Sequence, residues 1–183
     1  VRESQEHQRF ATKLMTEAFR RNDNMISNAI HLFIDAWPSG WMKTIMDCRR
    51  NPSPAYFAYR DALSPVLVSM RSDRFTYFSG EMISVESYVC NDTSAEGAYS
   101  MVFELYGGGK MLASGRKNFK MRECCAEYCC DAVFAAPETE DRESLDLKAY
   151  VLDEKGKAIS ENSFKIEVFA DVEVKKNENV VLI

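Results

Sequence analysis

Six cysteines are the residues of this chain with the most obvious capacity for chemistry, and four of them fall within one run of seven residues. Cys124 and Cys125 form one adjacent pair, and Cys129 and Cys130 form a second after an intervening Ala-Glu-Tyr. Four thiolates can enclose Zn²⁺, and a thiolate is also the reactive species in thiol redox chemistry. Taken alone, the run therefore predicts a thiol redox or metal module.

The spacing of the four cysteines argues against a metal. Zinc knuckles use Cys-x₂₋₄-Cys pairs in turns, whereas these pairs are vicinal and the run continues into a strand-like segment at Asp131. In a strand Cys129 and Cys130 point to opposite faces, so they cannot chelate jointly. We therefore expect no metal, no cofactor and free, half-buried thiols. Free thiols fit a reducing compartment, which favours a bacterial-type cytoplasmic location over secretion.

The composition excludes several classes of function. The chain has 183 residues, is 46% hydrophobic and carries a formal net charge of −5, which suits one good-sized globular domain or two small ones. A complete (β/α)₈ barrel needs about 250 residues. No basic footprint and no apolar run of about 20 residues is present, so we expect neither nucleic acid nor a membrane as a partner. A start at Val1 suggests processing or a piece of a longer protein.

The N-terminal third predicts a helix, a strand and a second helix. A broad apolar stripe with charged residues opposite, Glu17 among them, predicts a helix over 3–21. Residues 25–34 are apolar with few interruptions, which is typical of a parallel strand buried on both faces. Ser53 as N-cap and Pro54 at the first helical position predict a second helix. The stripe consists of Phe10, Ala11, Leu14, Met15, Ala18 and Phe19.

The remaining two thirds predict an antiparallel β-sandwich of about seven strands with frequent turn signals. Gly107-Gly-Gly-Lys and Asp153-Glu-Lys-Gly are hairpin signals. The apolar end at Val180-Val-Leu-Ile suggests a strand whose partners lie beyond this chain. The predicted strands cover 65–70, 82–90, 99–105, 111–119, 128–134, 145–152 and 158–169.

Two consecutive segments carry a resemblance to a known family. Residues 33–47 contain Asp35-Ala-Trp-Pro, and residues 50–69 contain Asn51-Pro-Ser-Pro-Ala-Tyr-Phe. Together they resemble glycoside hydrolase family 2, in which an Asn-Asp-x-Trp-Pro-like loop ends the eighth barrel strand. A Pro-Lys-Pro-x-Tyr-Tyr helix and an immunoglobulin-like domain follow in that family. The resemblance covers roughly residues 1–170, and Ile34 stands where an Asn is common.

The resemblance implies a fold and an activity. The fold class is mostly β: residues 1–65 would be the C-terminal end of a (β/α)₈ barrel, residues 66–170 an immunoglobulin-like antiparallel β-sandwich, and residues 171–183 a linker or the start of a further domain. Family members are retaining β-glycosidases with two catalytic glutamates at the ends of barrel strands four and seven. Both would lie upstream of Val1, so the chain alone is expected to be inactive. β-Galactosidase-like activity is the expected parent function.

Three residues would contribute to the rim of the sugar pocket. Asp35 and Trp37 match the family loop, and the resemblance implies hydrogen bonding for the first and contact with the sugar face for the second. Either His31 or Phe33 stands where the family usually has a Trp. Packing of Trp37-Pro38 against the second helix and a core position for His31 are the structural alternatives. The implied partner is a carbohydrate substrate.

A rival prediction is a non-enzymatic β-sandwich binding or adhesion module with a helical extension. The doubly apolar segment 25–34 would distinguish the two, because a stand-alone adhesin does not need a buried parallel strand. Without its barrel neighbours that segment would leave an unpaired edge, and unpaired edges recruit other chains. We therefore expect self-association through residues 10–35, or refolding of the segment onto the sandwich.

Overall fold

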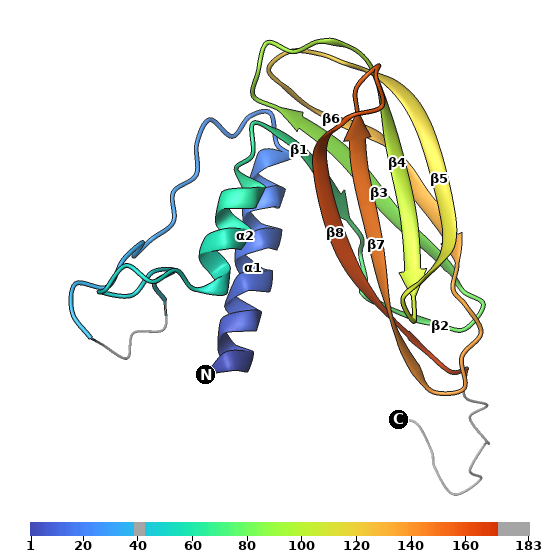
Figure 1. Ribbon diagram of the computed structural model, residues 1–183, viewed down its shortest axis with the longest axis horizontal. Coiled ribbons are helices and arrows are strands. Elements are labelled where there is room, and N and C mark those ends of the chain that lie inside the picture. Colours follow the sequence, from blue (N-terminus) through green and yellow to red (C-terminus); the bar gives the residue numbers. More distant parts are fainter. Residues whose placement is uncertain (39–42, 172–183) are drawn as a thin grey trace, which may run out of the picture.

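A computed structural model describes residues 1–38 and 43–171, in which two helices pack beside a β-sandwich (Figure 1). Neither helix is long and apolar enough to cross a membrane, within the part of the chain that is described. The helices are α1 (Arg2–Arg20) and α2 (Pro54–Ala62). The strands are β1 (Val66–Arg71), β2 (Thr76–Phe78), β3 (Met82–Asn91), β4 (Gly97–Gly107), β5 (Lys110–Met121), β6 (Cys125–Ala135), β7 (Arg142–Leu152) and β8 (Ala158–Phe169).

The strands form two sheets, which confirms the predicted β-sandwich. One sheet has the order β1-β3-β6 and the other the order β2-β8-β7-β4-β5. All pairs are antiparallel except β2 with β8, which is parallel. The seven predicted strands are all present. Strand β2 was not predicted, because a strand of three residues is too short to show a period of two.

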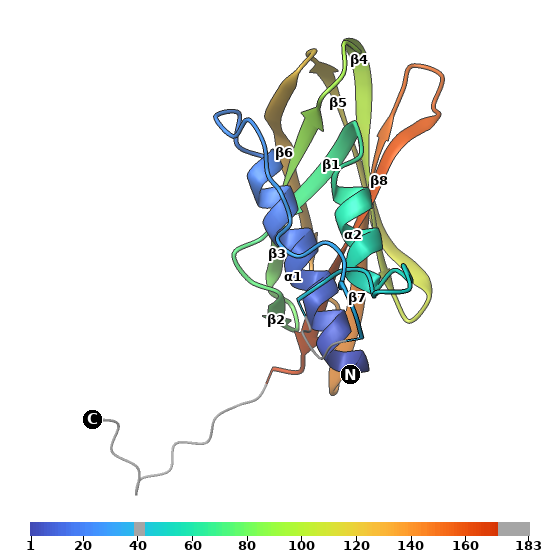
Figure 2. The ribbon, with the colours of Figure 1, turned by 90° about the vertical axis from the view of Figure 1, so that its left-hand side faces the viewer.

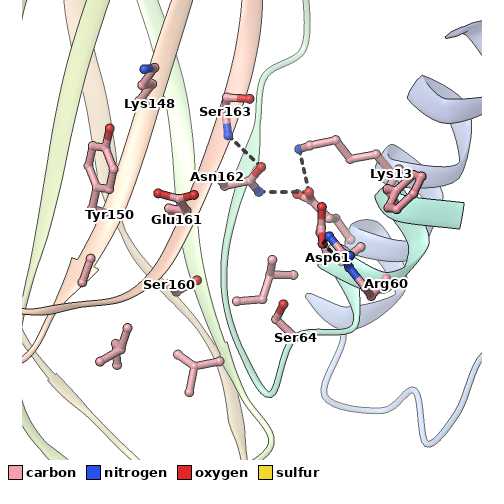
Figure 3. Close-up of a pocket in the computed structure, with 18 of the residues that line it drawn as sticks. Lys13, Arg60, Asp61, Ser64, Lys148, Tyr150, Ser160, Glu161, Asn162 and Ser163 are labelled. Carbon is pink, nitrogen blue, oxygen red and sulfur yellow. Dashed lines mark hydrogen bonds and ion pairs between the residues drawn. The ribbon is translucent and has the colours of Figure 1, made fainter. Parts of the chain in front are cut away.

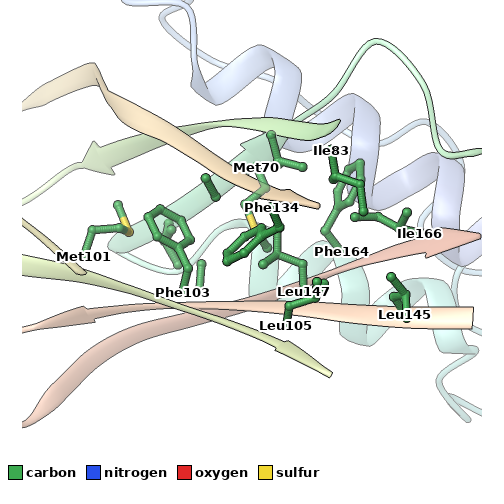
Figure 4. Packing of buried hydrophobic residues seen from close by; sticks show 14 of the residues in the cluster. Met70, Ile83, Met101, Phe103, Leu105, Phe134, Leu145, Leu147, Phe164 and Ile166 are labelled. Carbon is green, nitrogen blue, oxygen red and sulfur yellow. The ribbon is translucent and has the colours of Figure 1, made fainter. Parts of the chain in front are cut away.

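The hydrophobic core lies between the two sheets (Figure 4). Strand β3 alternates between exposed and buried side chains, and β7 buries Leu145, Leu147 and Ala149 completely. Side chains from the opposite sheet, such as Met70 and Ile83, fill the space between them. Burying each such side chain contributes about 1.5–3 kcal/mol, so the sandwich holds its own core.

The predicted hairpins are confirmed at both places. Strands β4 and β5 are joined at Gly108 and Gly109, whose φ angles are 54° and 77°. Glycine is required there because an L side chain disfavours positive φ. Gly156, with φ 77°, has the same role between β7 and β8.

The two helices pack against each other and lie across the sandwich near β1 and β8 (Figure 2). Arg20, at the end of α1, connects the helices to the sandwich. It donates hydrogen bonds to the carbonyl oxygens of Ala62 (2.9 Å) and Ser64 (2.5 Å) and to the carboxylate of Asp92 (2.8 Å). Its side chain is only 6% exposed. The short link between α2 and β1 is therefore fixed by the end of α1.

The buried face of α1 differs from the expected one. Thr16 and Glu17 are the buried residues of the helix, at 5% and 1% exposure. Met15 and Phe19 of the apolar stripe are 58% and 38% exposed, and Phe10, at 39%, contacts Phe75 with ring centroids 5.3 Å apart. The helix thus turns a polar row towards the sandwich and leaves much of its apolar stripe uncovered.

The strand expected over residues 25–34 is wrong, since the segment has no regular structure apart from an isolated bridge between Ile34 and Met46. Ile26 is 99% exposed, and Leu32 has a φ of 58°, which no extended strand accommodates. A strand needs a neighbouring strand to pair with, and apart from the Ile34–Met46 bridge the described chain supplies no pairing for this segment. The helix-strand-helix arrangement is not confirmed.

The second helix begins as predicted, with Ser53 at the N-cap and Pro54 in the first turn. Its N-cap hydroxyl does not bond to the helix, however, and is buried without a hydrogen-bond partner in the described chain. Residues 39–42 of the family-like segment 33–47 lie outside the described residues. So do the apolar end at 180–183 and the predicted linker over 171–183 apart from Asp171.

Candidate functional site

The loop that carries two of the three predicted site residues is anchored at the start of α2. The backbone N–H of Asp35 donates to the carbonyl oxygen of Met46 at 3.1 Å. Met46 forms isolated β-bridges with both Ile34 and Pro52, so the chain segments around these three residues lie side by side. The loop therefore has a fixed attachment directly before the second helix.

A turn organised by Asp47 supports this attachment. Its carboxylate accepts hydrogen bonds from the backbone N–H groups of Arg49 (2.9 Å) and Asn51 (2.7 Å) and from the side-chain amide of Asn51 (2.8 Å). The side-chain amide of Asn51, followed by its backbone N–H, holds the pKa of Asp47 below its usual value. Asp47 is thus a structural turn residue.

The structure places the three predicted sugar-binding residues at or near the surface. Asp35 is partly buried, whereas His31 and Trp37 are exposed, Trp37 at 68%. The core position considered for His31 and the packed position considered for Trp37 are therefore both wrong. None of the three lines the cleft described next. Their role in substrate binding stays a prediction.

A cleft of about 750 Å³ separates the two helices from strands β7 and β8 (Figure 3). Its floor is the outer surface of these strands, and one wall is formed by α1 and α2. Charges of both signs line it, together with the aromatic ring of Tyr150, so the cleft is suited to a polar ligand. Its charged lining consists of Arg9, Lys13, Glu17, Arg60, Asp61, Lys148 and Glu161.

Glu17 is one of the residues that line this cleft, and it is almost completely buried. Its carboxylate accepts hydrogen bonds from Lys13 Nζ (2.6 Å), Ser69 Oγ (2.8 Å) and Asn162 Nδ2 (2.9 Å). Ser69 Oγ also accepts from Arg21 at 2.6 Å. Three donors satisfy the carboxylate, so the group joins α1 to β1 and β8 and is not free for acid–base catalysis.

This network is not predictable from the helical pattern, in which Glu17 falls on the charged face and is expected to be solvated. The expectation is wrong because two of its partners come from distant parts of the chain, 52 and 145 positions away. Lys13 alone, four positions before it, was a visible signal of a side-chain pair. Such a pair is usually exposed, so the spacing gave no reason to expect burial.

The second vicinal cysteine pair has a geometry that the strand rule does not predict. In the pairing of β3 with β6, Ser87 lies opposite Cys130 and Tyr88 opposite Tyr128, so Cys129 is the extra residue of a β-bulge. Both Cys129 and Cys130 contact the hydrophobic core cluster. The expectation that they point to opposite faces is therefore wrong, because the bulge interrupts the alternation.

The described residues contain no group of three or more His, Cys, Asp or Glu side chains arranged to hold a metal ion. Of the six cysteines, Cys90 is buried, Cys124 is exposed and the other four are partly buried. Burial raises the pKa of the Cys90 thiol to about 11, so this residue behaves as an inert core side chain.

No family model and no curated protein matches the chain. Several solved structures are similar to part of it. A Paenibacillus cycloisomaltooligosaccharide glucanotransferase is 14% identical, with a TM-score of 0.48, over 58% of this chain and 15% of its own. A Bacteroides uniformis β-glucuronidase is 10% identical, with a TM-score of 0.45, over 54% and 12% of the two chains.

A third similar structure is Spo0M, a sporulation control protein of Bacillus subtilis. It is 12% identical, with a TM-score of 0.42, over 61% of this chain and 51% of its own. Further β-glucuronidases are also similar, one of them described as a member of glycoside hydrolase family 2. The chain thus spans a small part of these enzymes, and similarity this low decides nothing about function.

Proposed function

We propose that this chain is the C-terminal part of a retaining β-glycosidase related to glycoside hydrolase family 2. The observation that carries the proposal is the order of its parts: an Asp35-Ala-Trp-Pro loop, the helix opened by Pro54, and a β-sandwich that follows this helix after a link of three residues. A stand-alone sandwich needs neither the loop nor the helices for its core, which lies wholly between the sheets.

Uncovered apolar side chains in the N-terminal region support a missing neighbour. Ile26 is 99% exposed, Trp37 68% and Met15 58%. Exposed apolar residues that cluster along one part of a chain mark an interaction surface. In the proposed parent protein, the rest of a (β/α)₈ barrel would cover them. Large apolar residues exposed in the same region are Phe10, Met15, Phe19, Met25, Ile26, Phe33, Ile34 and Trp37.

The proposed role of the loop is to hold one sugar unit. The carboxylate of Asp35 would accept hydrogen bonds from sugar hydroxyl groups, and the exposed ring of Trp37 would pack on the apolar face of the pyranose. His31 would add a further polar group at the rim. Two glutamates supplied by upstream strands would act as acid/base and nucleophile, about 5–5.5 Å apart. A β-galactoside is the substrate we expect.

The test begins with the coding sequence upstream of Val1. We expect an Asn-Glu pair and a later Glu, each at the end of a predicted barrel strand. The complete protein should then hydrolyse one of the nitrophenyl β-galactoside, β-glucuronide and β-mannoside substrates, and the 183-residue chain should hydrolyse none. An upstream sequence without these glutamates, or turnover by the short chain that a mutation within it abolishes, would refute the proposal.

Variants of the complete protein test the loop itself. Asp35→Ala should lower kcat/KM by roughly 10–100-fold, because a hydrogen bond to a charged group contributes about 1.5–3 kcal/mol. Trp37→Ala should raise KM in particular. Asp73→Ala is the matched control, since its side chain is 90% exposed and lies on the sandwich. Unchanged kinetics in Asp35→Ala would remove the loop from the substrate site.

The cleft beside α2 favours a second candidate, a carbohydrate-binding or adhesion module without catalysis. Tyr150 and the polar groups around it could hold a sugar in the same chain. The two candidates differ in one measurable respect. A binding module would bind oligosaccharides as the isolated chain and lose affinity in Tyr150→Ala, whereas Asp35→Ala would bind as the wild type does.

A further inference from the structure

The bulge in β6 brings two neighbouring thiols to the same side of the strand. Cys129 and Cys130 are adjacent in the chain, and both side chains pack against the core cluster. Each is only partly buried, so small molecules in solvent can reach the pair. A regular strand would have separated the two thiols onto opposite faces.

Neighbouring groups hold Cys130 in the position of a nucleophile. The hydroxyl of Ser87 donates a hydrogen bond to the carbonyl oxygen of Cys130 and lies 3.6 Å from its sulfur, so it can turn its one proton to the sulfur when the thiolate forms. The hydrogen bond from Cys129 and then that from Ser87 hold the pKa of Cys130 below the ordinary value of a thiol, with a smaller contribution from the positive charge of Lys117. The same shared hydrogen bond raises the pKa of Cys129.

The other vicinal pair provides a natural comparison within the same chain. The thiol of Cys124 points to the carbonyl oxygen of Thr93 at 3.7 Å, whereas that of Cys125 points to the carbonyl oxygen of Arg122 at 3.1 Å. The two thiols therefore form hydrogen bonds to different carbonyl groups. Burial raises the pKa of Cys125, so its thiol is less reactive than an ordinary one.

We propose that Cys129 and Cys130 form a thiol–disulfide exchange site for small disulfides of the glutathione type. The Cys130 thiolate attacks one sulfur of glutathione disulfide, a bond forms between them, and one glutathione thiolate leaves. Cys129 then gives its proton to solvent and attacks the Cys130 sulfur, which releases the second glutathione. The two cysteines lose two electrons in total, and glutathione disulfide gains them.

The product is a disulfide between adjacent residues, and its geometry makes the reaction reversible. Neighbouring Cα atoms are about 3.8 Å apart, which is shorter than the roughly 4.4–6.8 Å that disulfides usually span. A bond formed at this distance is strained, and strained disulfides are reduced readily. The site would therefore open again when reduced glutathione predominates.

The test treats the chain with glutathione disulfide and maps the peptides by mass spectrometry. In the wild type we expect the peptide with Cys129 and Cys130 to lose two hydrogens and to retain no glutathione. Cys129→Ser should trap one glutathione on Cys130, because the resolving thiol is gone. Cys130→Ser should react at least about tenfold more slowly at this peptide, since the thiol with the lower pKa is absent.

The control is a Cys124→Ser, Cys125→Ser double variant, which should behave as the wild type does at the second pair. Circular dichroism of each variant establishes that the sandwich is folded. Glutathione that persists on Cys130 in the wild type would overturn the proposal. So would equal reaction rates for the wild type and Cys130→Ser, or earlier oxidation of the Cys124–Cys125 pair.

Discussion

A single buried carboxylate connects α1 to both sheets. Glu17 is 1% exposed, and its partners come from α1, β1 and β8. A buried charge is tolerated only when its hydrogen-bonding capacity is satisfied, and here Lys13, Ser69 and Asn162 satisfy it. The network therefore fixes the position of α1 through geometry rather than through the extent of apolar contact.

Removing this carboxylate should be costly. Glu17→Ala leaves Lys13, Ser69 and Asn162 without their common acceptor, so we expect a loss of about 3 kcal/mol in the free energy of unfolding. Urea denaturation followed by circular dichroism measures it. Glu3→Ala, in the exposed first turn of the same helix, should change stability by less than about 0.5 kcal/mol. Equal effects of the two substitutions would contradict the assigned role.

The pH dependence of alkylation should identify Cys130. Because its pKa is lowered, the thiolate is present at pH values below the ordinary thiol pKa of about 8.5, and iodoacetamide should label it there before the other cysteines. Asp131 opposes this shift, and Lys117 supports it. Ser87→Ala removes one hydrogen bond to the thiolate, so the labelling profile should move to higher pH. An unmoved profile would show that Ser87 does not stabilise the thiolate.

At the scale of elements, Ser53 occupies the N-cap position of α2, but its side chain forms no hydrogen bond with the helix. The hydroxyl of Ser53 is buried and unpaired within the described chain. Ser53→Ala should therefore be neutral or stabilising by up to about 1 kcal/mol, because it removes a desolvated hydroxyl. A working N-cap would instead lose about 1 kcal/mol on the same change. Thermal unfolding of the two proteins distinguishes the cases.

The sandwich was predictable from the sequence because its strands and turns are determined by residues close together in the chain. Alternation along β3 and the glycines at 108 and 109 determine strands and turns without reference to distant residues. The segment 25–34 failed for the opposite reason. Its apolar composition indicates burial, but a strand also needs a partner with free N–H and C=O groups, and composition does not reveal whether one is present.

The candidate site divides in the same way. The motif that contains Asp35 is contiguous in the sequence and can be recognised there, but the pairing of its loop with Met46 before α2 was not predicted. The Glu17 network and the thiol pair at Cys129 depend on long-range contacts. A β-bulge changes the direction of a side chain without any signature in the residues that flank it here, so alternation assigned Cys129 to the wrong face.

At the scale of the whole molecule, the uncovered apolar residues predict self-association through residues 10–35. Ile26, at 99% exposure, should contribute most. Size-exclusion chromatography with light scattering should show a mass that rises with concentration. Ile26→Ser should weaken association by about tenfold or more, because burying such a side chain contributes about 1.5–3 kcal/mol.

Val133→Ser is the control for this experiment. Val133 is also a large exposed apolar residue, at 52%, but it lies on β6 in the sandwich. Its substitution should leave the concentration dependence unchanged. A wild-type chain that stays monomeric at every concentration would show that the uncovered residues do not recruit a second copy.

The way in which Arg20 holds the link between α2 and β1 has a mechanical consequence. A hinge needs a few residues whose backbone dihedral angles can change freely. Here the chain crosses from helix to sandwich through residues 63–65, and hydrogen bonds from Arg20 restrain the carbonyl groups of Ala62 and Ser64 on either side. The link between α2 and β1 is therefore not a hinge. The helices and the sandwich move as one rigid unit, and the Asp35 loop moves with them.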